Sequence, residues 1–407
     1  MKATKAIINT THFGIPLYNI SMISYRYKMY SNASRSTVIS DTIDLFGVLF
    51  NYCIGTHKRY YQWYGKYLNA IDLKNHIAKL KKRPYYAWIK TLPSQAVQDV
   101  VERVDKAFKL FFRNQKHHIK SAPPTFKKIK SYKSFTLKQV GYKFLDNNRI
   151  RIGKRIYKYF NSRPIEGDIK TVTIKRYNQG ELYLIIVTNH ERSERKSLSG
   201  KSVGFDFGMK HFLVGSDNSV IDFPLFLKAQ LSKLKNLNRE FSRKKRGSNH
   251  WYVMKQRIAK LHKKIADQRN DYQWKLARYL LLTYDTVSLE HLNLRGMSKR
   301  YGRKISDFGF YSFIQKLIYL AKVFGKHVVQ IPTNYPSSKT CSNCGFIYRD
   351  LELKDREWDC PNCGKHHDRD FNASLNILRE GASSLGLDGV RPPLGGFCCL
   401  TPESPRL

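Results

Sequence analysis

The stretch Val-Gly-Phe-Asp-Phe-Gly, residues 203–208, places one carboxylate inside an apolar run that predicts a buried strand. A charge in the middle of such a strand costs several kcal/mol unless it is paired or bound to a metal. The flanking glycines allow another backbone or a substrate to come close. Taken alone, Asp206 could also be an acid that is paired within the core. The segment predicts a strand of an α/β domain and makes Asp206 a candidate site residue.

Two further acids lie at the ends of predicted elements. Glu290 ends the apolar strand of residues 286–290, and Asp370 lies at the start of a helix in Asp-Arg-Asp-Phe-Asn-Ala, residues 368–373. Singly, Glu290 could be a surface charge and Asp370 a helix N-cap. Together with Asp206 they make a set of hard oxygen ligands for two Mg²⁺ ions, which at about 4 Å apart can hold the attacking and leaving oxygens of a phosphodiester displacement. Metal binding also explains why a strongly basic protein would cluster acids.

Four of the seven cysteines form two Cys-x-x-Cys pairs, and each pair is followed by glycine. Such a turn aims two thiolates at one point, and glycine permits the left-handed backbone that the turn needs. The two pairs therefore predict a closed, structural Zn²⁺ site rather than a secreted disulfide framework, in a reducing compartment. His366 and His367 are spare ligand candidates and more often would be packing partners. The predicted zinc ligands are Cys341, Cys344, Cys360 and Cys363.

The charge balance points to a polyanionic partner. The 407 residues include 73 Lys and Arg against 31 Asp and Glu, a net charge of +42. Nucleic acid is the common partner of such a chain, and an anionic membrane surface is the alternative. We find no run of about 18 apolar residues and no signal peptide, so we expect no membrane span. The 42% hydrophobic content excludes wholesale disorder.

Two segments concentrate the positive charge. Between Lys106 and Lys158 there are 16 Lys and Arg and one acid, and between Lys228 and Lys264 there are 13 and one. Lysine and arginine neutralise phosphates, and aromatic rings offer a stacking face to bases. A single basic helix face is usually only solvated surface, but two such segments favour nucleic-acid binding. The interleaved aromatics are Phe126, Tyr132, Phe135, Tyr142, Tyr157, Tyr159, Trp251 and Tyr252.

The first 200 residues alternate between strand and helix patterns. One or two strands are predicted between Ser24 and Val38, and helices from Asp41 to about Leu68 and from Pro93 to about His118. This order favours a β-barrel interrupted by a helical domain. The strands that follow are predicted at 133–144, 149–159, 169–176 and 182–189, with a hairpin turn at Asn178–Gly180.

From Lys201 the pattern becomes α/β. A strand and hairpin at 203–214 precede a long helical segment, Lys228 to about Tyr284, which is interrupted near residues 247–249. Strands are predicted at 286–289 and 328–331, and a helix at Phe313–Phe324. The residues from Gly381 to Leu407 lack periodicity and are predicted to be loosely ordered.

In this order the motifs resemble the TnpB family, transposon-encoded RNA-guided DNA endonucleases related to miniature type V CRISPR effectors. LPSQAVQDV (92–100) followed by AFKLFF (107–112) is similar to the family's helical recognition region, and the flanking strands are similar to its wedge barrel. Phe205 and Phe207 stand where the family more often has branched residues, and both keep the strand bulky and apolar. The motifs that carry the resemblance are GFDFGMK (204–210), SLEHLNLRGM (288–297), CSNCG (341–345), CPNCG (360–364) and DRDFNASLNI (368–377).

The resemblance implies a multidomain α+β and α/β protein with an RNase H-like RuvC nuclease domain, whose catalytic acids fall on Asp206, Glu290 and Asp370. In the last motif the second aspartate, Asp370, is the implied acid rather than Asp368. The implied domains are a wedge barrel (1–40 and 121–199), a helical recognition domain (41–120), the RuvC domain (200–340 and 365–380), the four-cysteine zinc module (341–364) and a flexible tail (381–407).

The resemblance further implies two catalytic Mg²⁺ ions, one structural Zn²⁺, a guide RNA from the transposon end and double-stranded target DNA beside a short adjacent motif. We expect a cytoplasmic, nucleoid-associated activity in a prokaryote, a monomer and no membrane partner. Gln95 is a candidate for reading a base of the motif, because glutamine can contact adenine through two hydrogen bonds. It could equally be a surface residue at a helix start. The alternatives are a nuclease-inactive RNA-guided repressor and a strand-joining transposase.

Overall fold

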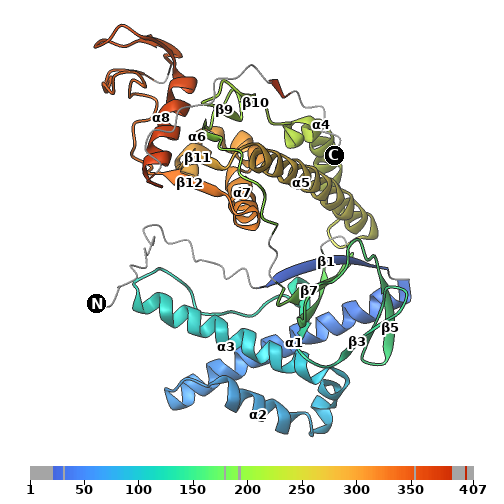
Figure 1. Cartoon of the computed structure of the whole chain (residues 1–407). Helices are drawn as coiled ribbons and strands as arrows, with labels where there is room; N and C mark the ends of the chain where they lie inside the picture. Colours follow the sequence, from blue (N-terminus) through green and yellow to red (C-terminus); the bar gives the residue numbers. More distant parts are fainter. Residues whose placement is uncertain are drawn as a thin grey trace. The chain divides into compact units, whose positions relative to one another are not determined.

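A computed structural model describes residues 22–30, 33–177, 180–190, 194–352, 354–386 and 399–400. The chain divides into two compact units, Met1–Arg192 and Ser193–Leu407, and each is described by itself. Figure 1 shows the first as helices beside a sheet and the second as a sheet between helices.

The first unit contains a seven-stranded antiparallel sheet in the order β2-β6-β7-β1-β5-β4-β3. The predicted strands are confirmed, although the segments 133–144 and 149–159 each contain two strands separated by a turn. The predicted turn residues Asn178 and Gln179 lie outside the described residues. Closure of this sheet into a barrel stays a prediction. The strands are β1 (Ile23–Tyr30), β2 (Ser134–Leu137), β3 (Tyr142–Leu145), β4 (Arg149–Ile152), β5 (Arg155–Tyr159), β6 (Ile169–Arg176) and β7 (Leu182–Thr188).

Three helices lie between β1 and β2 in the sequence: α1 (Ala33–Tyr64), α2 (Ala70–Leu80) and α3 (Ser94–Lys116), with short 3₁₀ turns at Pro84–Thr91 and Ile129–Ser131. The helical insertion into the strands is therefore confirmed. The predicted second strand up to Val38 is wrong, because α1 begins at Ala33. Thr37, Val38 and Ile39 are β-branched and favour a strand locally, but burial of a helix face overrides this preference.

Helix α1 is a core helix. Its segment Thr37–Tyr64 is long and apolar enough to cross a membrane by length and composition alone, a property that was not expected from the sequence. However, Ile43, Phe46 and Leu49 are fully buried in the core of the first unit. The ring of Phe46 packs 5.1 Å from that of Phe135 on β2. The apolar face of α1 is therefore used by the protein's own core.

The second unit is built on a sheet in the order β12-β11-β8-β9-β10-β15. Strands β8, β11 and β12 run parallel, whereas β9 is antiparallel to both β8 and β10. The antiparallel strands β8, β9 and β10 thus form one part of the sheet, and β8, β11 and β12 form a parallel part. The strands are β8 (Ser202–Asp206), β9 (Leu213–Gly215), β10 (Val220–Ile221), β11 (Thr286–Glu290), β12 (His327–Ile331) and β15 (Cys399–Leu400).

The sheet is covered on both faces (Figure 1). Val203 and Phe205 belong to the core formed with α5 and α7, whereas Gly204 between them faces α8, as the alternation of side chains along a strand requires. The break near residues 247–249 is confirmed, with Ser248 capping α5. The helices are α4 (Phe226–Ser242), α5 (Asn249–Thr283), α6 (Leu294–Phe308), α7 (Phe310–Phe324) and α8 (Arg369–Ser383).

Helix α6 was not predicted, and α8 extends further than predicted. Gly296 and Gly302 interrupt the apolar period of α6, so its sequence resembles a loop. Helix α8 continues to Ser383, beyond the predicted start of the tail at Gly381. The rest of that tail, residues 387–398 and 401–407, lies outside the described residues. A small hairpin of β13 (Glu357–Asp359) and β14 (His366–Asp368) precedes α8.

Candidate active site

Two of the candidate acids end neighbouring parallel strands. Strands β8 and β11 pair in register, with Phe205 opposite Leu289, and the next residue on each strand is Asp206 and Glu290. Both side chains are partly exposed. Because the carboxyl ends of parallel strands meet at one edge of a sheet, where α/β folds commonly bind ligands, this pairing brings the two acids together.

Helix α8 brings the third acid to the same place. It packs against β8, β9, β11 and β12. The approach to β8 is so close that a Cβ on Gly204 would lie 2.3 Å from the carbonyl oxygen of Ser374. A Cβ on Gly381 would likewise lie 2.1 Å from Oγ of Ser288 on β11. These contacts fix α8 across the two strands, with Asp370 in its first turn.

The two aspartates of the last motif have different roles. Asp368 is the N-cap of α8, and its Oδ1 accepts a hydrogen bond from the backbone N–H of Phe371 at 2.8 Å. Asp370 lies within the first turn and does not cap the helix. The sequence left capping open as a reading of Asp370, and the structure gives that role to Asp368.

The electrostatics of Asp206 show that the three acids interact. Burial, and after it the negative charges of Glu290 and Asp370, raise the pKa of Asp206 to about 8. Burial also raises the pKa of Glu290. A carboxyl group beside two other acids resists ionisation, and divalent cations remove that penalty. The donor set therefore fits hard divalent cations such as Mg²⁺.

Two arginines flank the acids. Nη1 of Arg356 lies 3.4 Å from Oδ1 of Asp370, and the positive charge of Arg369 opposes the rise in the pKa of Asp206. Arg369 is itself held by donation from Nη1 to the carbonyl oxygen of Glu352 at 2.9 Å. Neither arginine was a candidate from the sequence, because a position before Asp370 in the polypeptide gives no signal that Arg356 contacts Asp370 or that Arg369 lies near Asp206.

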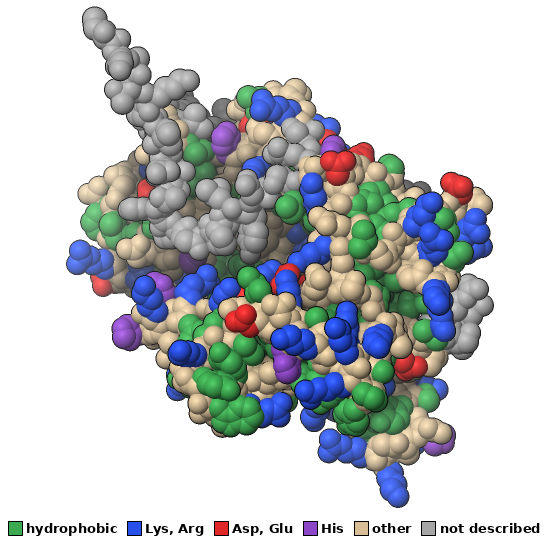
Figure 2. Space-filling model, turned by 90° about the horizontal axis from the view of Figure 1, so that it is seen from below, with side chains coloured by type: hydrophobic (Ala, Val, Ile, Leu, Met, Phe, Trp, Pro, Cys, Tyr) green, Lys and Arg blue, Asp and Glu red, His purple; other side chains and the backbone are tan. Residues whose placement is uncertain are grey.

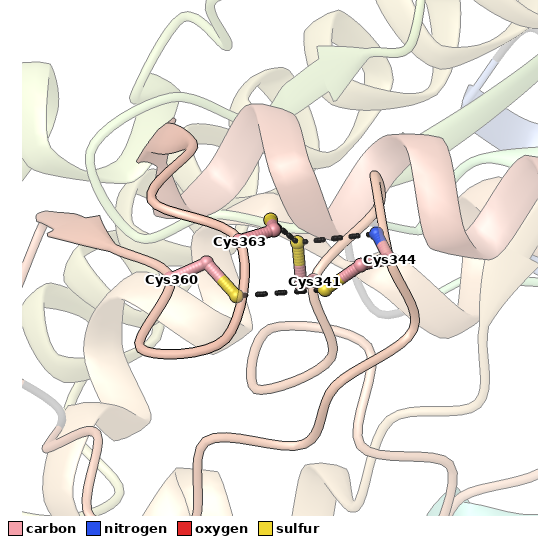
Figure 3. A group of neighbouring side chains, drawn as sticks. All are labelled: Cys341, Cys344, Cys360 and Cys363. Carbon is pink, nitrogen blue, oxygen red and sulfur yellow. Dashed lines mark hydrogen bonds between the residues drawn. The ribbon is translucent and has the colours of Figure 1, made fainter.

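The four cysteines form a compact cluster (Figure 3). Their sulfur atoms all lie within 4.8 Å of one another. Within the described part of the chain, no other group of three or more His, Cys, Asp or Glu side chains is gathered closely enough to be identified as a metal site in the same way. Cys341 and Cys363 are 3.7 Å apart, and Cys344 and Cys360 are 3.6 Å apart. Four thiols at this separation fit a tetrahedral metal ion such as zinc.

The asparagine of each cysteine loop reaches across to the other loop. Nδ2 of Asn362 lies 3.5 Å from Sγ of Cys344, and Nδ2 of Asn343 lies 3.6 Å from Sγ of Cys363. The bond from Asn362, with a backbone N–H, lowers the pKa of the Cys344 thiol to about 6. Burial raises the pKa of Cys341 to about 12. The amides thus stabilise thiolate on the exposed side of the cluster.

The two histidines after the second loop differ. His367 is buried against Trp358, with ring centroids 4.8 Å apart, and its Nε2 lies 3.1 Å from Sγ of Cys341. His366 is paired through Nδ1 with Oδ1 of Asp359 at 2.7 Å. His367 therefore packs beside the cluster, and His366 faces away from it toward acidic partners.

Gln95 has a defined structural role. Its Oε1 accepts hydrogen bonds from the backbone N–H groups of Lys138, Gln139 and Val140, at 3.0, 2.7 and 3.1 Å. The side chain thereby fastens the residues after β2 to the start of α3. Its oxygen is used within the protein, and base reading stays a prediction that concerns the amide nitrogen alone.

The basic segments carry fewer exposed aromatic rings than expected. Tyr132, Phe135, Tyr157 and Tyr159 are buried in the core of the first unit, which corrects the expectation that they could stack on bases. Phe126 and Tyr252 remain exposed.

Exposed aromatic rings that were not predicted lie at the end of α1. They belong to Tyr61, Trp63 and Tyr64, with 56%, 72% and 61% of their surface accessible. Figure 2 shows Lys and Arg side chains spread over one face of the molecule, among exposed hydrophobic ones.

Two family models match the chain. The model described as "Probable transposase" matches residues 185–301, and the model described as "Cas12f1-like, TNB domain" matches residues 310–377. The first range contains Asp206 and Glu290. The second contains the four cysteines and Asp370, so the matched ranges together include the whole candidate site.

Similar proteins extend over most of the chain. A Streptomyces pristinaespiralis protein named "Putative RNA-guided DNA endonuclease" is 27% identical, with 91% of this chain and 92% of the relative covered. An Escherichia coli protein with the same name and the addition InsQ is 28% identical, covering 83% and 87%. Among solved structures, a Cas12f1–sgRNA–target DNA complex matches with a TM-score of 0.57 at 15% identity, covering 85% of this chain and 83% of that chain. The last match shows a mixed α/β fold resembling that of Cas12f1.

Proposed function

Because this chain belongs to the TnpB family, we propose that it is an RNA-guided endonuclease that cleaves double-stranded DNA beside a short adjacent motif. The observation that carries the proposal is the convergence of Asp206, Glu290 and Asp370 from β8, β11 and α8. The names of the two relatives and of the Cas12f1 complex support the substrate class.

The three carboxylates would hold two Mg²⁺ ions. When bound, such ions supply Lewis acidity for phosphodiester hydrolysis. The protein contributes the geometry: the pairing of β8 with β11 fixes Asp206 and Glu290, and the packing of α8 on Gly204 fixes Asp370. Ordered ligands on rigid elements hold the reacting groups in position without a covalent nucleophile.

The sheet of the second unit supports an RNase H-like RuvC domain. Three antiparallel strands, β8 to β10, are followed through α4 and α5 by two parallel strands, β11 and β12, on the other side of β8. This order puts the first acid on the central strand and the second on its parallel neighbour. The four-cysteine module then lies in sequence between β12 and α8, immediately before the last acid.

Zinc would have a structural role. Four thiolates complete a tetrahedral shell and leave no position for substrate. The cluster sits on the turn between β13 and β14 and on the loop that follows β12, and both segments otherwise have little core of their own. Metal ligation would therefore supply much of the stability of residues 341–368.

Guide RNA and target DNA would bind to the basic surfaces. The loop between α4 and α5 carries Arg243, Lys244, Lys245 and Arg246 in succession, all exposed. Base pairing would supply sequence specificity, and the protein would recognise the backbone of the guide–target duplex. The first unit would act as the wedge and recognition region that reads the adjacent motif. A monomer acting on DNA in the prokaryotic cytoplasm fits this scheme.

Purification tests the proposal. The chain is expressed with the RNA-coding sequence that flanks its gene, and the co-purified RNA is sequenced to give the guide. We expect cleavage of a plasmid that carries the matching target when Mg²⁺ is added, and no cleavage by the Asp206→Ala variant. Intact plasmid with every adjacent motif in a randomised library would contradict the proposal.

The description of one family model as a transposase favours a strand-joining transposase as the second candidate. Such an enzyme needs no guide, so it would purify without a defined RNA and would join DNA ends rather than release them. A nuclease-inactive repressor would bind the guide and target but leave DNA uncut. Co-purified RNA and cleavage products therefore separate the three functions.

A further inference from the structure

Helix α8, which carries Asp370, is attached to both cysteine loops. The second loop, Cys360–Cys363, is the turn between β13 and β14, and β14 continues directly into α8 at Arg369. The backbone N–H of Arg369 also donates to the carbonyl oxygen of Arg356 at 2.8 Å, which ties the start of the helix to the start of β13. The second loop is therefore connected to Asp370 through the chain itself.

The first loop, Cys341–Cys344, is connected to α8 through a side chain. Asn372 is fully buried, and its Oδ1 accepts a hydrogen bond from the backbone N–H of Ser342 at 2.9 Å. Its Nδ2 donates to the carbonyl oxygen of Thr340 at 2.8 Å. Both bonds lie on the loop that presents Cys341, and Asn372 is two residues after Asp370. A buried amide whose oxygen and nitrogen are both hydrogen-bonded in this way helps to fix one arrangement of the two segments.

The two cysteine loops differ at the position that contacts Asn372. The first loop has Ser342 between its cysteines, with a backbone N–H that reaches Asn372, whereas the second loop has Pro361 at the corresponding position and therefore no N–H. A proline is thus compatible with the turn of a cysteine loop. The N–H of Ser342 is needed for the contact with α8 rather than for the turn.

We propose that Asn372 is a positioning residue that couples the first cysteine loop to the first turn of α8, and so sets the position of Asp370 relative to Asp206 and Glu290. This inference rests on the proposed function, because it concerns the binding of Mg²⁺ by those acids. Hydrogen bonds behind metal ligands orient them, and their loss typically costs about 10- to 100-fold in metal affinity or activity.

The chain offers a matched pair of variants. Ser342→Pro removes the N–H that donates to Asn372 and introduces the residue that the other cysteine loop carries at this position, and Pro361→Ser is the reverse exchange in the loop that makes no such contact. Mg²⁺ binding to the zinc-loaded full-length protein is measured by titration calorimetry without guide or DNA. We expect the Mg²⁺ dissociation constant of Ser342→Pro to rise about tenfold, with unchanged zinc content, and that of Pro361→Ser to stay at the wild-type value.

Two further variants keep the inference falsifiable. Asn372→Ala alters neither cysteine loop, so it gives the same comparison if Ser342→Pro loses zinc. Asn376→Ala removes an equally buried amide one turn later, which bonds to Ser337 and Thr340 at 2.9 and 2.6 Å. Equal Mg²⁺ affinity in wild type and Asn372→Ala, or an equal loss in Asn376→Ala, would overturn the positioning role.

The cleavage assay separates this inference from the proposed function. With guide and target present, we expect Asn372→Ala to lower kcat at limiting Mg²⁺ and to leave the KM for DNA unchanged, because the DNA-binding surface is intact. Wild-type protein that binds Mg²⁺ with the expected variant dependence but never cuts DNA would contradict the endonuclease function alone.

Discussion

The cysteine cluster and the carboxylate site differ in how they are assembled. The four cysteines lie within one short segment, and their sulfur atoms all approach within 4.8 Å. The carboxylates come from β8, β11 and α8, and burial together with their mutual repulsion raises the pKa of Asp206 to about 8. One site is made by local turns, and the other needs the whole sheet and its covering helix.

This difference determines which residues each site depends on. A local site depends on its ligands and on the loops between them, so its stability is that of the module. A site assembled from distant elements depends also on residues that never touch a ligand, such as Gly204 and Asn372, because these set the distance between elements.

The largest expected effect is on DNA cleavage, and it distinguishes Asp370 from Asp368 within the same motif. Asp370→Asn should lower DNA cleavage by about three orders of magnitude, since a metal-binding carboxylate contributes several kcal/mol to the barrier. Asp368→Asn should leave cleavage within about twofold, because asparagine is as good an N-cap as aspartate. Single-turnover cleavage of a labelled target measures both. The reverse ranking would mean that Asp368, and not Asp370, belongs to the site.

Removal of zinc should have the next largest effect. Cys360→Ser should release the zinc and unfold the β13–β14 module, because ligation would supply much of its stability. Elemental analysis should give one zinc per wild-type chain. The control is Cys53→Ala, which replaces a buried cysteine of the other unit and should keep the same ratio of zinc to protein. A variant that lost zinc but retained full cleavage would show that the cysteine module does not position Asp370.

The local site was predictable from sequence, and the carboxylate site only in part. The spacing of two Cys-x-x-Cys pairs indicates a metal cluster because four ligands within one segment have few other ways to fold. Asp206 stood out as a charge in an apolar strand. Glu290 and Asp370 did not stand out alone; they were selected because, together with Asp206, they make a set of hard oxygen ligands, and the family resemblance implies the same three acids.

What the sequence could not supply was the contact between elements. Gly204 indicated that another backbone or a substrate could come close, but not that the backbone would be that of α8. Helix α6 was not predicted because its glycines interrupt the apolar pattern. Asn372 and Asn376 did leave a signal: two asparagines four residues apart on the buried face of a helix require partners from another segment. That signal predicts contacts with another segment but does not identify Thr340 and Ser342 as the partners of Asn372.

The pH dependence of stability probes the burial of Asp206 beside two other acids, which is a property of the carboxylate site. The folded state holds the proton of Asp206 up to about pH 8, whereas an unperturbed aspartate loses it near 3.8. This proton therefore stabilises the metal-free fold fully below about pH 4, and the contribution is lost as the pH rises to about 8. In Mg²⁺-free buffer the Tm of wild type should fall by several degrees between about pH 5 and 8, more steeply than that of Asp206→Asn. Equal slopes in the two proteins would mean that the fold does not raise the pKa of Asp206.

The smallest expected effect concerns Gln95. Its place in the sequence made it a candidate for reading a base, but its hydrogen-bond partners are backbone groups of residues 138–140. Gln95→Ala removes the acceptor for three backbone N–H groups and should cost about 1 kcal/mol, seen as a lower Tm. Gln95→Glu keeps an acceptor oxygen and should retain the Tm while losing the amide donor that a base contact requires. Cleavage of a library of adjacent motifs by Gln95→Glu then isolates recognition from stability. An unchanged motif preference would leave Gln95 with the role that its three hydrogen bonds already define, the attachment of residues 138–140 to α3.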